Sequence, residues 1–173
     1  IVPCSRVYTI KEGDYAGLYG EGPEYEALSS FTARVGNSNL NLALKAVDLA
    51  NKLGLDVITT AECISWAMEL YERGELSRSE TDGLELEWGN AEAILGLVRK
   101  IAYREGFGDL LADGVRRAAE KLGKGKEIAF HVKGLELIQA DPRGLKGYGL
   151  GYAVSSRGAD HLRGLPFDDL HSG

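Results

Sequence analysis

A chain of 173 residues and 18.7 kDa is long enough to build a hydrophobic core without disulfides or a structural metal. Its formal net charge of −6 and its pI near 5.2 argue against a large phosphate-binding surface, so we expect no nucleic-acid partner. The apolar runs are far shorter than the roughly 20 residues that span a bilayer. With such short apolar runs we expect no membrane partner. The two cysteines lie far apart, which favours a reduced, cytoplasmic setting.

The first half of the chain changes from an irregular to a helical pattern. Residues 1–38 contain many glycines, tyrosines and charges without a sustained period, so we expect short strands and loops there. Apolar residues then recur at helical spacing over residues 39–54, which predicts a helix that ends at Gly54. Thr59 followed by Glu62 has the form of a capping box, and it opens a second helix whose apolar circumference predicts burial.

The second half continues with helices and then becomes extended. A charged surface connection leads to a helix over residues 91–106, which Asn90 can cap, and to a single helix over residues 110–123. Residues 123–139 alternate apolar and polar positions, as a short strand or extended piece does. Residues 143–158 include four closely spaced glycines that allow close backbone approach. The sequence therefore predicts a mostly α fold, an irregular helical bundle with one short extended excursion.

Two candidate sites lie near the N-terminus, and each also has a purely structural explanation. Cys4 is a potential cluster ligand, although a single cysteine is more often a small apolar residue. Glu24 and Glu26 follow a Gly-Pro turn and are suited to acid–base chemistry if one of them is buried. A solvated loop explains the same two carboxylates.

Two more candidates lie further along the chain. At residues 51–56 an amide, free backbone groups and a carboxylate meet where a helix ends, which suits a ligand rich in donors; a plain helix C-cap explains the pattern equally well. In SSRGADHLRG, residues 155–164, two arginines can bind anions, Asp160 can pair with either, and His161 is the histidine of a dense polar cluster. A salt-bridged loop is the alternative explanation there.

Taken in order, these segments resemble the aldehyde ferredoxin oxidoreductase family of tungsten, sometimes molybdenum, pterin enzymes. The resemblance is carried by PCSRV, GPEYE, LGLD, ISWAMELYERG, GFGDLLADGVRRAAEKLG, ADPRG and SSRGADHLRG. It implies a fragment of a longer enzyme that begins just inside a C-x-x-C-x-x-x-C cluster motif. Residues 1–38 would be an irregular leader, residues 39–126 a helical domain, and residues 127–173 an extended segment, a glycine-rich helix and a cofactor-facing loop that lead into the next domain.

The resemblance also assigns residues to the cofactors. Cys4 matches the third cysteine of the 4Fe-4S motif, so it is the expected metal ligand. The segment Asn51–Asp56 matches a pterin-binding loop through Asn51, Gly54, Leu55 and Asp56, with an asparagine where the family usually has aspartate. An amide carries no charge, so its bond to the pterin should be weaker than that of a carboxylate.

Catalytic roles follow from the same resemblance. Glu26 matches a glutamate near the metal, with Glu24 as second choice; His161 matches a histidine beside the metal, and Arg163 is placed to meet the pterin or its phosphates. The implied reaction is oxidation of a small aldehyde to a carboxylic acid with ferredoxin as electron acceptor. The implied cofactors are a tungsten (or molybdenum) bis-pterin, a 4Fe-4S cluster and Mg in the parent enzyme.

The resemblance further implies that the chain carries only part of the site. We expect the isolated chain to be inactive and to bind none of these cofactors, because the remaining faces of the site lie in other domains. A non-catalytic helical binding module stays open as a different function for the same fold. A subunit of a complex, whose missing domains come from a separate chain, stays open as well.

Overall fold

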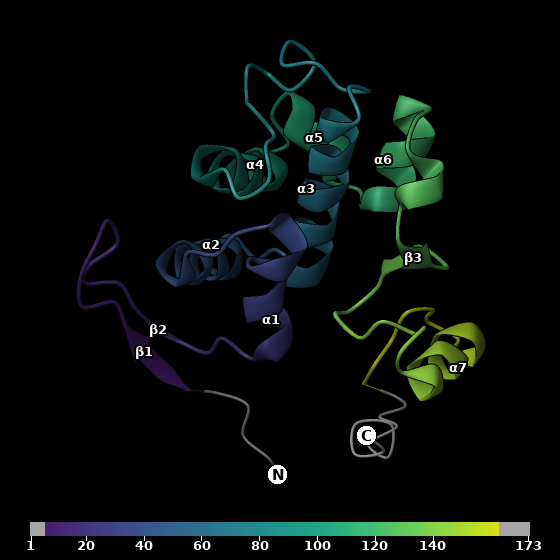
Figure 1. The fold of residues 1–173 in the computed structure, drawn as a ribbon, viewed down its shortest axis with the longest axis horizontal. Coiled ribbons are helices and arrows are strands. Elements are labelled where there is room, and N and C mark those ends of the chain that lie inside the picture. The colour runs from purple at the N-terminus through teal and green to yellow at the C-terminus, as the bar shows by residue number, and fades with distance from the viewer. Residues whose placement is uncertain (1–5, 163–173) are drawn as a thin grey trace.

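The structure is a computed structural model in which residues 6–162 are described. Figure 1 shows a helical fold, which confirms the mostly α class. The helices are α1 (Tyr25–Ser30), α2 (Leu40–Lys52), α3 (Val57–Glu72), α4 (Ala91–Tyr103), α5 (Phe107–Leu111), α6 (Val115–Leu122) and α7 (Lys146–Val154), with short 3-10 turns η1 (Ala33–Val35) and η2 (Lys126–Ile128). Two antiparallel hairpins pair β1 (Val7–Thr9) with β2 (Tyr19–Glu21) and β3 (His131–Val132) with β4 (Leu135–Glu136).

Helix α3 stands at the centre of the fold, with α2 and α4 on one side and α6 on the other (Figure 1). Apolar residues on every face of this helix predict that it is buried. The structure confirms this, since side chains on different faces, such as Ile64, Trp66 and Met68, are fully buried. The predicted capping box is wrong. Asp56 caps α3, its side chain accepting from the Thr59 amide at 2.8 Å, because the helix begins before Thr59.

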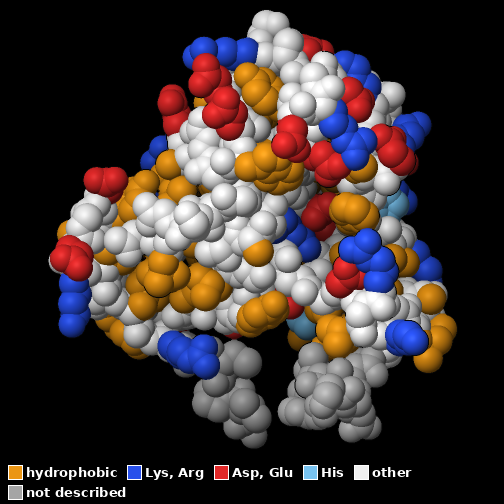
Figure 2. Space-filling model, in the orientation of Figure 1, with side chains coloured by type: hydrophobic (Ala, Val, Ile, Leu, Met, Phe, Trp, Pro, Cys, Tyr) orange, Lys and Arg blue, Asp and Glu red, His pale blue; other side chains and the backbone are white. Residues whose placement is uncertain are grey.

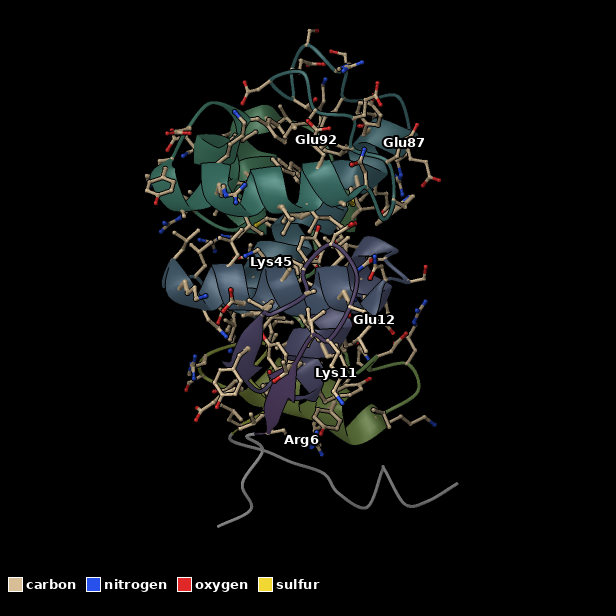
Figure 3. All side chains as sticks on the ribbon, turned by 90° about the vertical axis from the view of Figure 1, so that its left-hand side faces the viewer. Arg6, Lys11, Glu12, Lys45, Glu87 and Glu92 are labelled. Atoms are coloured by element: carbon tan, nitrogen blue, oxygen red, sulfur yellow. The ribbon has the colours of Figure 1, made fainter. Side chains whose placement is uncertain are left out.

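The hairpin β1–β2 packs on the outer side of α2, as Figure 3 shows. The Tyr8 hydroxyl donates to the Leu44 carbonyl at 3.4 Å, and the Asn41 side chain donates to the Glu12 carbonyl at 3.1 Å. The irregular N-terminal pattern therefore forms a strand pair, followed by α1 and η1. Both short helices contact α3.

The predicted helix over residues 110–123 is divided in two, which corrects that prediction. Gly114 separates α5 from α6 with φ +89°, a conformation that side chains rarely adopt. A Cβ at Gly114 would lie 2.8 Å from Glu136 Oε1, and this oxygen accepts from the Val115 amide at 2.8 Å. At the break, a carboxylate from a distant part of the chain therefore satisfies the first backbone amide of α6. The other helix predictions hold, including the Asn90 cap of α4.

A second, smaller core forms around α7, the helix at the lower right of Figure 1, below α6 and β3. The rings of Tyr148 and Tyr152 on α7 are 6.1 Å apart and pack with Ile138, Ala140 and Ala159. Of the extended piece predicted at 123–139, residues 131–136 form β3 and β4, joined by a turn at residues 133–134, whereas Lys126–Ile128 forms the 3-10 turn η2 instead. Within residues 6–162, no helix combines the length and apolar character that crossing a membrane requires.

Candidate active site

The two candidate glutamates of the GPEYE segment have different surroundings. Glu24 is the N-cap of α1: its carboxylate accepts from the backbone amides of Glu26 and Ala27 at 2.8 and 2.9 Å. Glu26 lies in the first turn and is buried, and its Oε2 accepts from the Gln139 backbone amide at 2.7 Å. Glu24 therefore has a capping role in the structure, whereas Glu26 faces the segment that precedes α7.

The surroundings of Glu26 favour the protonated form of its carboxyl more strongly than bulk water would. Burial raises the pKa of the Glu26 carboxyl, while the Gln139 amide bond and the positive charges of His161 and Arg34 lower it in part. The neighbouring Glu24 raises it further. A buried carboxyl whose pKa is raised is a stronger proton acceptor than an exposed one, and is suited to acid–base chemistry.

The segment from Asn51 to Asp56 forms the corner between α2 and α3. The Gly54 amide donates to the Asn51 carbonyl at 3.1 Å, the Leu55 amide donates to the Ala50 carbonyl at 3.0 Å, and Gly54 has φ +70°. This is an ordinary glycine C-cap followed by the Asp56 N-cap. The Asn51 and Asp56 side chains are exposed, and a Cβ on Gly54 would meet no atom within 4 Å, so the corner is open to a large ligand.

The described part of the SSRGADHLRG segment, residues 155–162, is folded against the β3–β4 hairpin. Gly158 lies so close to β3 that a Cβ would overlap the Val132 carbonyl oxygen, and Lys133 donates to the Ser155 carbonyl at 2.7 Å. Arg157 pairs with the buried carboxylate of Asp160 at 3.1 Å. The loop is thus salt-bridged, and the same packing leaves His161 half-buried.

The structure brings some of the predicted site residues together. Asp56 and His161 line one cavity of about 110 Å³, to which Thr59 and Glu136 also contribute. Glu26 is close enough to His161 for their charges to interact. The residues Asn51, Gly54 and Leu55 line neither this cavity nor a larger one beside Arg34 and Glu62. Cys4 and Arg163 lie outside the described residues.

A buried ion pair beside these residues was not predicted from the sequence. Arg34, in η1, pairs with Glu62 of α3 at 3.1 Å, and both side chains are at most 9% exposed. Burial raises the pKa of Glu62 to about 7, although Arg34 and a backbone bond from Phe130 lower it. The signal is present in the sequence, because Glu62 is a charged residue in an apolar helix, but the capping-box pattern gives it a different role.

A larger cavity of about 470 Å³ opens over this ion pair. Trp66, Trp88 and Phe130 form its aromatic part, and residues 137–143 form the opposite wall. Figure 2 shows a hollow where the helices around α3 meet the segment leading to α7, with charged side chains of both signs beside it. Within residues 6–162, no three His, Cys, Asp or Glu side chains are grouped to hold a metal ion.

Comparison with known proteins gives the family. Residues 1–170 match the family described as aldehyde ferredoxin oxidoreductase, domains 2 and 3. The tungsten-containing aldehyde ferredoxin oxidoreductase of Pyrococcus furiosus is 44% identical over 144 residues, which are 83% of this chain and 24% of that protein. An aliphatic sulfonate oxidoreductase, WOR-like subunit, of the same organism is 34% identical over 167 residues, 92% of this chain and 27% of that protein.

A solved structure shows the same arrangement of elements. The active site complex BamBC of benzoyl coenzyme A reductase, in complex with 1,5 dienoyl-CoA, superposes with a TM-score of 0.66 and 27% identity, over 84% of this chain and 22% of that chain. The chain spans about a quarter of the length of the curated relatives it matches. On the family match and these identities, the chain belongs to the aldehyde ferredoxin oxidoreductase family.

Proposed function

We propose that this chain is part of a tungstopterin oxidoreductase that oxidises aldehydes to carboxylic acids and delivers the electrons to ferredoxin. The relatives named tungsten-containing aldehyde ferredoxin oxidoreductase support this reaction. The single observation that carries it is the proximity of a buried carboxyl, Glu26, to His161, since these residues come from opposite ends of the chain. As the chain spans a quarter of those relatives, we expect it to be inactive alone.

The donor set of this chain suits a pterin better than a directly ligated metal ion. The described residues offer no cluster of metal ligands, but they offer an exposed amide, open backbone at a glycine corner and a carboxylate. Asn51, Gly54 and Asp56 would hold the pterin edge through such hydrogen bonds. The tungsten pterin, when bound, supplies the acceptor for the two electrons of the reaction, and Cys4 would ligate the 4Fe-4S cluster that passes them on.

The protein residues would handle protons and orientation. Oxidation of an aldehyde to an acid consumes one water molecule and releases two protons along with two electrons. Glu26 would accept a proton from the attacking water or the substrate, since burial raises the pKa of its carboxyl and makes it a stronger base than an exposed carboxylate. His161 would donate a hydrogen bond to the carbonyl oxygen, which stabilises the negative charge that develops there. Because Glu26 is buried, bulk water does not take its place as the proton acceptor.

A second candidate function is a subunit of a multi-chain oxidoreductase with another substrate. It is favoured by the relative named as a WOR-like subunit of an aliphatic sulfonate oxidoreductase and by the BamBC complex. In that case the same residues would face a cofactor, but the remaining walls of the site would come from a partner chain. Co-purification from the native source would show such a partner.

The experiment compares this chain with the same gene extended in both directions to full length. Both proteins are purified anaerobically, and their tungsten, molybdenum and iron contents are measured together with aldehyde-dependent reduction of ferredoxin. We expect metal and activity in the long protein and neither in the 173-residue chain. A long protein without tungsten, molybdenum or aldehyde-dependent reduction would refute the proposal.

A matched pair of variants tests the role of Glu26 in the long protein. Glu26→Gln should lower kcat by roughly 10²- to 10⁴-fold, the usual contribution of a positioned proton acceptor. Glu21→Gln, an exposed glutamate on β2, is the control and should leave kcat unchanged. Equal activity of the two variants, both loaded with metal, would remove Glu26 from the mechanism.

A further inference from the structure

We propose that Arg34 is a positioning residue for Glu26, because it fixes the segment 137–139 whose backbone amide holds the Glu26 carboxylate. The inference rests on the proposed function only for the task of Glu26 in catalysis. Its structural content concerns one carboxylate and the groups that set its position and charge. Arg34 is not among the residues that the sequence or the family resemblance singles out.

The Arg34 guanidinium joins three parts of the fold. Its Nη1 pairs with Glu62 at 3.1 Å and donates to the Ile58 carbonyl at 3.4 Å. Both residues lie in the N-terminal half of α3, one turn apart. Its Nη2 donates to the Leu137 carbonyl at 2.6 Å, 103 residues along the chain. In the amide orientation that satisfies both groups, the side-chain oxygen of Gln139 accepts from Arg34 Nε at 2.5 Å. All these bonds leave the planar fork in one fixed orientation.

The same segment then reaches Glu26. Two of the three residues from 137 to 139 are bound by Arg34, and the backbone amide of the last, Gln139, donates to Glu26 Oε2 at 2.7 Å. The arginine is itself nearly inaccessible, with a side chain 9% exposed, so water cannot take over its bonds without reorganising the site. Loss of the fork would therefore loosen the amide that favours ionised Glu26.

The charges around Glu26 make this role measurable. His161, from the C-terminal loop, and Arg34 favour its ionised form; Glu24, on its own helix, disfavours it; and Tyr152, from α7, faces it with a phenol whose pKa burial raises. Removing Arg34 takes away a favourable charge and weakens the Gln139 bond at once. Both changes raise the pKa of Glu26 further.

The test follows the titration of Glu26 itself rather than turnover. The chain is produced with ¹³C in its glutamate carboxyl carbons, and the Glu26 signal is assigned by its absence in Glu26→Gln. Its titration is then compared in the wild type, Arg34→Lys and Arg34→Met. We expect the midpoint to move to higher pH in both variants, further in Arg34→Met, because lysine keeps the charge but cannot replace the fork.

Arg78→Met is the matched control. Arg78 also pairs with a carboxylate, Glu85, and donates to a backbone carbonyl, that of Gly83, but on the exposed connection between α3 and α4. It should leave the Glu26 midpoint unchanged. If Arg34→Met does not fold, as judged by circular dichroism, Arg34→Lys decides: an unmoved or lowered midpoint overturns the proposal.

Activity of the long protein separates this inference from the proposed function. An enzyme that oxidises aldehydes, with a Glu26 midpoint insensitive to Arg34, would keep the function and reject the positioning role. A protein without aldehyde oxidation, with a midpoint that moves as described, would do the reverse. In the active enzyme, Arg34→Lys should lower kcat/KM by roughly tenfold near the acidic end of the pH profile and less at high pH.

Discussion

Replacing Gly114 by alanine should destabilise the chain far more than replacing another glycine of positive φ. Gly114 has φ +89° and ψ 162°, a region that is open essentially to glycine, and forcing alanine into it costs about 1–3 kcal/mol. The new Cβ would also lie 2.8 Å from Glu136 Oε1. Displacing that buried carboxylate would break its bonds to Val115 and Thr59, at a further cost of about 1–3 kcal/mol.

The sum is about 4 kcal/mol, which corresponds to a lowering of Tm by roughly 8–16 °C for a chain of this length. Gly123→Ala is the control, since Gly123 has φ +74° in the left-handed region but open space around it. It should cost only about 1 kcal/mol. Urea unfolding of both variants, followed by circular dichroism, measures the difference. Equal midpoints would mean that the Glu136 contact contributes nothing.

Two further predictions concern buried polar groups. The stabilisation from protonated Glu62 is complete below the ordinary pKa of 4.5 and disappears as the pH rises through about 7. Urea titrations should therefore show the free energy of unfolding of the wild type, relative to Glu62→Gln, falling between pH 5 and 8 by on the order of 3 kcal/mol, and a rise would mean that pairing with Arg34 outweighs burial. Trp66→Phe should cost about 2 kcal/mol by leaving the Gly125 carbonyl unpaired, whereas Trp88→Phe, at a partly exposed site, should cost under 1 kcal/mol in the same assay.

Local sequence signals predict the helices but not where distant residues interrupt them. Helix α4 has its apolar stripe and its Asn90 cap within 14 residues, so the pattern contains all that the helix needs. The break at Gly114 brings the Val115 amide to Glu136, more than 20 residues later, and local spacing gives no sign of that bond. The pattern of residues 110–123 does not include that carboxylate. Its apolar spacing continues through the glycine and therefore predicts one helix. The capping box at Thr59 fails for a simpler reason, since Asp56 is available three residues earlier.

The candidate site divides in the same way. The family resemblance names Glu26 and His161, which the structure places near each other. It gives no reason to choose Arg34, because the partners of that side chain lie up to 103 residues away. The role of Glu24 depends only on neighbouring residues, because its position just before the first turn of α1 is typical of a helix cap.

Three buried carboxylates fix how the smaller core sits on the helices. Glu26 accepts from Gln139, Glu62 pairs with the arginine that holds Leu137, and Glu136 accepts from Thr59 and Val115. An apolar interface alone tolerates small shifts, because the hydrophobic effect has no direction. Directional hydrogen bonds to buried carboxyl groups do not tolerate them, because a shift leaves a polar group unpaired in a low dielectric. Glu26 and His161 come from the two sides of this interface, so the bonds that fix its register also fix the distance between the two residues on which the proposed chemistry depends.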